Sequence, residues 1–236
     1  MQSYPVIQLS LTSLPKRHMN LITLIFNPFA ENTYLLIGSN KQAVVIDPGM
    51  SNAAEEAQFL AMLTAHGATP VAIWLTHSHI DHVLGLSFLL NQYPSISFGH
   101  SESDRPTLKS NEVVGPMYGY HNFSLPALDR EILLEEGKAL EFDGNVFQIL
   151  DVSGHSQGHL VFYSAEQNLA IVGDTLFQDS VGRYDLPGGN QMQLFENIRS
   201  KLLALSADTV IYPGHGPSTT IGREKKFNPF FKHLHT

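Results

Sequence analysis

Short apolar runs separated by polar turns follow one another along most of the chain. Their length and their content of β-branched and aromatic residues predict strands. The runs with this pattern are 21–26, 33–37, 43–46, 71–75, 96–98, 132–134, 145–152, 160–164, 169–172 and 209–212. Segments with helical spacing are fewer and interrupt the strands in each half of the chain: 53–66, 83–90 and 190–205. This order predicts an α/β protein folded as a four-layer αββα sandwich, with two sheets face to face and helices outside.

The first predicted helix has signals at both ends. Asn52 and Glu55 resemble a capping box in which Asn replaces Ser or Thr. Gly67 is a typical stop after the last residue with helical spacing. We therefore expect this helix to begin after Asn52 and to end before Gly67.

The segment 101–128 has the weakest pattern in the chain. Proline and glycine interrupt it repeatedly, and aromatic residues collect towards its end. A long irregular stretch inside a compact domain is often a binding loop. We therefore expect a lid or a substrate pocket here, with Tyr118 and Tyr120 as candidate substrate-binding residues. The alternative is a surface insertion without a role.

Composition sets the class of protein. The chain has 236 residues, of which 43% are hydrophobic and 15% charged, as in an ordinary globular protein. This length suffices for one large domain. We expect an N-terminal extension over 1–18 and a single domain over 19–236. The formal net charge of −8 argues against a broad phosphate-binding surface, so nucleic acid is not an expected partner.

The chain contains no cysteine, which excludes disulfides, thiolate metal ligands and a cysteine nucleophile. No apolar run approaches the ~18–20 residues of a membrane span, so no membrane partner is expected. The basic pair Lys16-Arg17 lies at the end of the N-terminal segment, which is the wrong order for a secretory signal. These features predict a cytoplasmic protein.

Metal-binding side chains concentrate in Thr76-His77-Ser78-His79-Ile80-Asp81-His82, directly after the apolar run 71–75. His77 and His79 are two positions apart, so in extended backbone they point to the same side. Asp81 and His82 follow at the turn into the next helix. A cluster of ionisable groups at the end of a core strand is costly unless something binds it, and a metal or a pair of metals explains it best. The alternative is a polar loop that happens to be rich in histidine.

Three further turns place a candidate ligand beside glycine, just past an apolar run. They contain Gly154-His155 with His159, Gly173-Asp174, and Gly214-His215-Gly216. Glycine lets the backbone approach closely and adopt positive φ. One such turn means little, but three of them together with the histidine-rich cluster indicate a composite site at strand ends.

On these motifs the chain resembles the metallo-β-lactamase fold superfamily and, within it, the glyoxalase II-like hydroxyacylglutathione hydrolases of the short bacterial type. The resemblance covers roughly residues 20–230. It implies one metal bound by His77, His79 and His155, and a second bound by Asp81, His82 and His215. It also implies that Asp174 bridges the two. Imidazole and carboxylate ligands suit Zn(II), Fe(II) or Mn(II), and we expect two divalent ions with Zn(II) as the first choice.

Two metals about 3.5–4 Å apart lower the pKa of a bridging water, position a carbonyl and hold the oxyanion that forms. Asp81, beside the hydroxide, is the candidate catalytic residue that accepts or relays its proton. Asp47 and His159 are expected to orient ligands from behind. Arg183 is expected to brace the site by pairing with Asp185 or another carboxylate, the alternative being substrate binding.

The resemblance implies hydrolysis of a thioester such as S-lactoylglutathione, whose thiolate leaves without strong acid assistance. The classical enzymes bind glutathione with a helical C-terminal domain, whereas about 20 residues follow His215 in this chain. Its short basic tail offers instead Arg223, Lys225 and Lys226 for a substrate carboxylate, or as exposed residues without that role. A persulfide dioxygenase with a single iron is the main alternative, since Gly182-Arg183-Tyr184-Asp185 matches the Gly-Arg-x-Asp pattern of those enzymes. A hydrolase of lactones or other esters, a metal-binding protein without activity, and an RNA-processing member are further alternatives.

Overall fold

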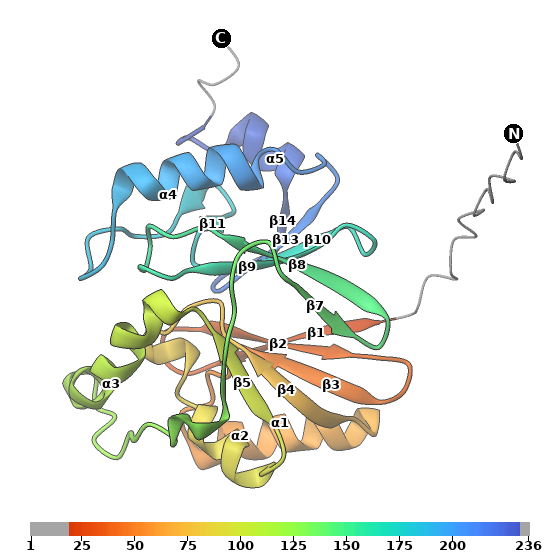
Figure 1. Cartoon of the computed structure of the whole chain (residues 1–236), viewed down its shortest axis with the longest axis vertical. Coiled ribbons are helices and arrows are strands. Elements are labelled where there is room, and N and C mark those ends of the chain that lie inside the picture. The colour runs from red at the N-terminus through yellow and green to blue at the C-terminus, as the bar shows by residue number, and fades with distance from the viewer. Residues whose placement is uncertain (1–18, 232–236) are drawn as a thin grey trace, which may run out of the picture.

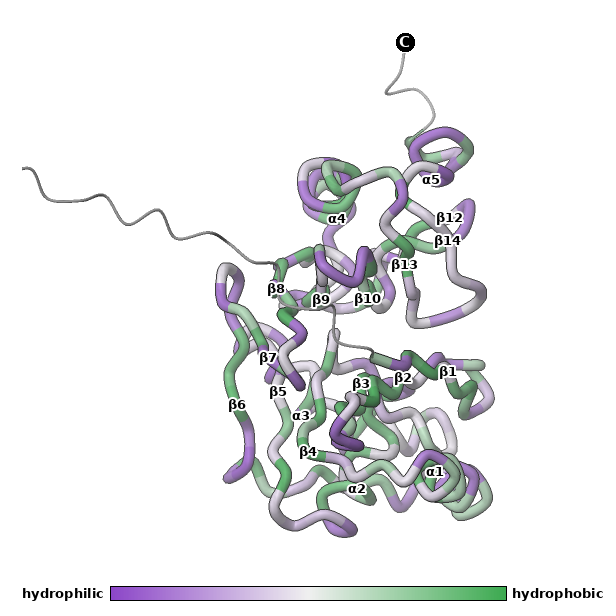
Figure 2. The backbone as a smooth tube through the Cα atoms, turned by 90° about the vertical axis from the view of Figure 1, so that its right-hand side faces the viewer, coloured by the Kyte–Doolittle hydropathy of each residue, from purple (hydrophilic) through white to green (hydrophobic). Residues whose placement is uncertain are grey.

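The computed structural model describes residues 19–231 and shows two six-stranded sheets packed face to face within that range (Figure 1). The first sheet has the strand order β1 to β6, and the second has the order β14-β13-β10-β9-β8-β7. Figure 2, turned by 90°, shows the same layers with α1 and α2 outside the first sheet and α4 and α5 outside the second. The predicted αββα sandwich is confirmed.

The first half of the fold contains six strands and three α-helices. Its strands are β1 Asn20–Phe26, β2 Glu31–Ile37, β3 Gln42–Ile46, β4 Thr69–Trp74, β5 Ser97–His100 and β6 Glu131–Leu133. Its helices are α1 Ala53–His66, α2 Leu86–Gln92 and α3 Arg105–Met117.

The second half completes the sandwich. Its sheet contains β7 Ala139–Phe142, β8 Asn145–Asp151, β9 Leu160–Ser164, β10 Leu169–Gly173, β13 Val210–Pro213 and β14 Thr219–Thr220. A small hairpin joins β11 Leu176–Phe177 to β12 Ser180–Val181. Helix α4, Gln191–Asn197, runs on into a π-helical turn at Ile198–Leu202, and α5 is Ile221–Phe227.

Three hydrophobic cores hold the four layers together. On β2, Leu35 packs with α1 and α2, whereas its neighbours Tyr34 and Leu36 pack between the sheets against Trp74 and Phe162. All seven residues of β2 are buried, because both faces of this sheet are covered. The third core lies between the second sheet and α4 with α5. The buried strands explain why continuous apolar runs, and not alternating ones, marked them in the sequence.

The signals at the ends of α1 are confirmed, with one change. The Asn52 side chain accepts hydrogen bonds from the backbone N–H groups of Ala54 and Glu55, and Gly67 adopts the left-handed conformation at φ 59°. Glu55, however, does not complete a capping box onto Asn52. Its carboxylate accepts from the backbone N–H groups of Ser51 and Asn27, so it joins the helix start to the β1–β2 turn.

The expectation of an irregular stretch over 101–128 is wrong for its first half, which forms α3. Pro106 occupies the first turn of that helix, where no intrahelical N–H donor is needed, so it does not break the helix. The periodic signal was weak because α3 buries only Leu108, Asn111 and Gly115. Within the described residues, no helix is long and apolar enough to cross a membrane.

Candidate metal centre

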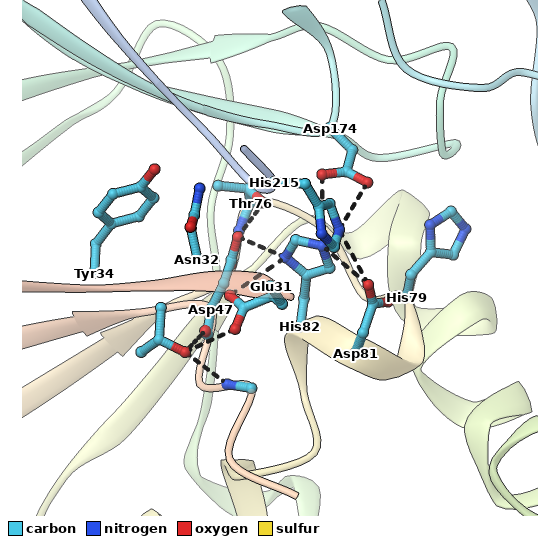
Figure 3. Close-up of polar contacts among 12 residues, drawn as sticks. Glu31, Asn32, Tyr34, Asp47, Thr76, His79, Asp81, His82, Asp174 and His215 are labelled. Carbon is cyan, nitrogen blue, oxygen red and sulfur yellow. Dashed lines mark hydrogen bonds and ion pairs between the residues drawn. The ribbon is translucent and has the colours of Figure 1, made fainter. Parts of the chain in front are cut away.

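The four predicted turns meet at one edge of the sandwich. The cluster 76–82 follows β4, His155 lies in the turn after β8, Asp174 follows β10, and His215 follows β13. Figure 3 shows Asp174 reaching from the second sheet towards Asp81 and His82, which lie on the turn after β4. We call the seven predicted ligands the metal cluster: His77, His79, Asp81, His82, His155, Asp174 and His215.

The first group of the metal cluster is His77, His79 and His155, whose ligand atoms lie within 4.8 Å of one another. His79 Nδ1 and His155 Nε2 are 2.9 Å apart. The other ring nitrogen of His155 donates to the carbonyl of Arg183 at 2.7 Å, which leaves Nε2 free to coordinate.

The second group is Asp81, His82 and His215, again with ligand atoms within 4.8 Å. His215 Nδ1 donates to the carbonyl of Phe29 at 3.0 Å, so its Nε2 faces Asp81 Oδ2 at 3.2 Å. Asp174 lies between the groups. Its Oδ1 is 3.5 Å from His82 Nε2, and its Oδ2 is 3.6 Å from His155 Nε2.

The residues of the metal cluster fit divalent cations. His77 Nε2, His82 Nε2 and Asp174 Oδ1 are buried atoms without a hydrogen-bond partner in the described part of the chain. Leaving such atoms unpaired costs about 1–3 kcal/mol each, which a metal ion would offset. Imidazole and carboxylate donors suit several divalent metals and select no single one.

Burial keeps most of these imidazoles neutral, which coordination requires. Burial lowers the pKa of His77 and of His155, and it lowers the pKa of His79 to about 3, with the neighbouring His155 adding to the effect. His82 and His215 differ, because the carboxylates of Asp81 and Asp174 outweigh their burial and raise their pKa values.

Asp47 supports the metal cluster from behind. Its carboxylate accepts from the backbone N–H of Thr76 at 2.7 Å and from the Thr76 hydroxyl at 2.5 Å, and it pairs with His82 Nδ1 at 3.1 Å. One side chain therefore fixes both the start of the motif and the ring of a ligand. His159 acts on Asp174: its Nε2 accepts the backbone N–H of Asp174 at 3.0 Å. Asp47 and His159 each contact a predicted ligand or its backbone, and their role in orienting the ligands stays a prediction.

Position 214 requires glycine, because Asp174 and His82 lie very close to its backbone. A Cβ there would lie 2.1 Å from Asp174 Oδ1 and 2.7 Å from His82 Cε1. The glycine therefore leaves room for Asp174 to lie between the two groups.

Three residues that support the site were not found in the sequence. Asp104 accepts the backbone N–H of Ser78, and Asn111 donates to the Ser78 carbonyl at 2.8 Å, so the start of α3 holds the peptide between His77 and His79. Glu31 is fully buried, with Oε1 3.8 Å from His82 Nδ1. None of the three lies in a ligand motif, and only folding brings them near the cluster.

The sheets are joined beside the metal cluster. Asn32 donates to the carbonyls of Pro213 and Gly216 at 2.9 Å each, and the Tyr34 hydroxyl donates to Pro213 at 2.5 Å. Glu31 and His215 also form an isolated β-bridge. These contacts fasten β2 of the first sheet to the turn after β13 of the second.

A cavity of about 820 Å³ opens over the metal cluster. Tyr118 and Arg183 line it, and Arg183 pairs with Asp185 through two hydrogen bonds of 2.9 and 3.0 Å, while its role in bracing the site stays a prediction. Tyr120 lies outside this lining.

The basic tail does not reach the cavity. Arg223, Lys225 and Lys226 lie on α5. Arg223 is paired with Asp179 and with Glu224 at 2.8 Å. Their predicted role in substrate binding therefore finds no support in this geometry.

Comparison with known proteins agrees with this site. The profile of the Metallo-beta-lactamase superfamily matches residues 26–215. The hydroxyacylglutathione hydrolase GloC of Haemophilus influenzae is 36% identical over 213 residues, which cover 90% of this chain and 98% of that protein.

Two solved structures are similar over nearly their whole length. TTHA1623 in a di-iron-bound form is 37% identical with a TM-score of 0.75, covering 89% of this chain and 99% of that one. The B3 metallo-beta-lactamase BLEG-1 is 30% identical with a TM-score of 0.78, covering 90% and 99%. With its fold, its ligand turns and these similarities, the chain belongs to the metallo-beta-lactamase superfamily of metallohydrolases.

Proposed function

We propose that the chain is a thioester hydrolase of the hydroxyacylglutathione hydrolase type that holds two divalent ions in its metal cluster. The observation that carries the proposal is the position of Asp174, whose two oxygens face His82 of one group and His155 of the other. A carboxylate between two three-residue groups suits a ligand shared by two ions. The similarity to GloC supports the reaction type, and the similarity to di-iron TTHA1623 supports two ions.

Two ions held there would activate water and polarise a carbonyl. The chain itself supplies the proton acceptor. Burial alone would raise the pKa of Asp81, but His82 and His215 outweigh it and lower that pKa, so the carboxylate stays ionised. Its Oδ2 faces the cluster and the cavity, where it can accept the proton of an attacking water. A thiol has a pKa near 8.5, so a thiolate leaves without a strong acid beside it.

The proposal is tested by metal analysis combined with a substrate panel on the purified full-length chain. We expect close to two ions per chain and cleavage of thioesters, with S-lactoylglutathione as the first compound to try. Chelator-treated protein reloaded with metal is the control, and activity should return on reloading. Cleavage of lactones or other esters, with thioesters untouched, would reject the thioester assignment.

A persulfide dioxygenase is the second candidate. The ion pair of Arg183 and Asp185 at the cavity, within the Gly-Arg-x-Asp pattern, favours it. A single bound iron together with oxygen uptake on glutathione persulfide would establish it and contradict the hydrolase proposal.

A further inference from the structure

One face of α3 forms a wall of the cavity. The residues on this face recur at helical spacing and change in character along the helix. Its first half is polar, with Thr107, Ser110 and Asn111, and Asn111 is the residue that holds Ser78. Its second half is apolar, with Val114, Met117 and Tyr118. A molecule bound in this cavity therefore meets an apolar surface along the second half of α3.

Phe29 lines the same cavity and extends this surface. Its ring meets the ring of Tyr118 edge to face, with centroids 5.5 Å apart. We call Phe29, Val114, Met117 and Tyr118 the apolar wall. Met117 is 79% exposed and Tyr118 53% exposed, so much apolar area is available for a ligand to cover. The carbonyl of Phe29 also accepts from His215, which places the wall next to the second group of the metal cluster.

The cavity offers no unpaired cation among the described residues. Apart from the metal cluster, Arg183 is the charged side chain in its lining, and Asp185 engages its guanidinium through two nitrogens. The rest of the opposite side is Gln157 with the segment 186–188. Glutathione carries two carboxylates, whose binding normally requires Arg, Lys or free N–H groups. The charges of this cavity therefore do not match glutathione.

We propose that this site selects thioesters that carry an apolar arm, aliphatic or aromatic, which packs on the apolar wall, and that carboxylates of the thiol part contribute nothing to recognition. The proposal rests on the proposed function for the thioester bond. The recognition of the apolar arm depends on the wall alone, so it can be measured without catalysis.

The first measurement is equilibrium binding to the metal-loaded full-length chain by titration calorimetry. The probes are uncleavable S-alkyl thioethers of N-acetylcysteamine, a neutral thiol, from S-methyl to S-hexyl. Each added methylene should tighten binding by about 2- to 4-fold, because a buried methylene contributes about 0.8 kcal/mol when fully covered. S-hexylglutathione should bind no more tightly than S-hexyl-N-acetylcysteamine. Probe affinity that does not depend on alkyl chain length, or binding that requires the glutathione carboxylates, would overturn the proposal.

Two matched variants assign the effect to the wall. Met117→Gln places an amide on the wall, whereas Val113→Gln makes a comparable change one turn earlier on α3, at a residue that is 72% exposed and outside the cavity. Both side chains are exposed, so both variants should fold. Met117→Gln should weaken binding of the hexyl probe by about 5-fold or more and leave the methyl probe unchanged, and Tyr118→Ser should act in the same direction. Equal effects of Met117→Gln and Val113→Gln would contradict the proposal.

Hydrolysis of the matching acyl thioesters separates this proposal from the proposed function. If no thioester is cleaved while thioether binding still depends on chain length and on Met117, the proposed function fails and the apolar wall stands. If acetyl and hexanoyl thioesters are cleaved with equal kcat/KM, and thioether affinity does not change with chain length, the proposed reaction stands and the proposal about the apolar wall fails.

Discussion

The metal cluster and the apolar wall border the same cavity but are built in opposite ways. The cluster residues come from turns after strands, and most are buried with one ring nitrogen fixed by a hydrogen bond, as in His155 and His215. The wall comes mainly from one helix, and Met117 and Tyr118 are largely exposed. The cluster therefore tolerates little change, whereas the wall can change without disturbing the chemistry below it.

The strongest way to break the cluster is to remove Asp174. Residues that merely support ligands change metal affinity by about 10- to 100-fold, so loss of a shared ligand should exceed about 100-fold at both positions. We expect Asp174→Ala to lose both ions and hydrolysis, as measured by metal analysis after dialysis. Asp185→Asn, which removes an exposed carboxylate nearby, is the control and should retain its metal. Retention of both ions by Asp174→Ala would refute its bridging role.

Replacing Asp47 tests the support behind the cluster. Asp47 adopts φ 51°, a left-handed conformation that asparagine also accepts, so Asp47→Asn changes the charge without straining the backbone. We expect metal affinity to fall by about 10- to 100-fold, because the charged partner of His82 and Thr76 is lost. Competition with a chelator of known affinity measures this. Unchanged affinity would show that Asp47 only supports the fold.

Lowering the pH is expected to destabilise the folded protein through the histidines at the metal cluster and to leave the apolar wall unaffected. In metal-free protein burial lowers the pKa of His77, His79, His155 and His159, while their unfolded-state pKa is near 6.5. The unfolded chain then binds more protons, so stability falls as the pH drops below about 6.5. His82 and His215, whose pKa values are raised, act in the opposite direction but are fewer.

Denaturant unfolding in the presence of chelator at pH 7.5, 6 and 5 measures this effect. The midpoint should fall steadily across the series. A midpoint that rises towards pH 5 would show that His82 and His215 dominate the balance.

Asn111 lies on the face of α3 that also carries most of the apolar wall, and it holds the loop of the metal cluster, so it sharpens the comparison. It lines the cavity and also donates to the buried carbonyl of Ser78. Asn111→Ala should lower the free energy of unfolding by about 1–3 kcal/mol, because that carbonyl loses its donor, and it should weaken metal binding. Ser110→Ala, which also faces the cavity but bonds only to the carbonyl of Thr107, is the control. If the two variants have equal effects, Asn111 does not hold the loop 76–82 in place.

The smallest effect is expected outside both regions. Arg223 lies on α5, paired with Asp179 and Glu224, and away from the cavity lining. Arg223→Ala should leave kcat/KM within about 2-fold, because Arg223 does not line the cavity and so would not touch a substrate bound there. A large rise in KM for an anionic thioester would restore the basic tail as a substrate contact.

The parts of the site that could be predicted from sequence are those fixed by local backbone. The histidine-rich motif and the glycine-flanked turns follow strand ends, so spacing nominated these four stretches. The resemblance to the metallo-β-lactamase fold superfamily then implied which seven of their residues are ligands. Asp104, Asn111 and Glu31 could not be found this way, because they reach the cluster from elements with no ligand motif. Helix α3 was missed because it buries only Leu108, Asn111 and Gly115, so no continuous apolar stripe marks it in the sequence.

The division of the metal cluster between the sheets has a consequence for the life of the protein. The first half supplies four ligands and the second supplies three, and Asn32 and Tyr34 fasten the halves together beside them. We expect metal held by this set to bind only the assembled chain, so bound ions would stabilise the junction by mass action. The temperature at which the halves part would then rise with the free metal concentration around the protein. Scarcity of metal would therefore shorten the protein's lifetime as well as reduce its activity.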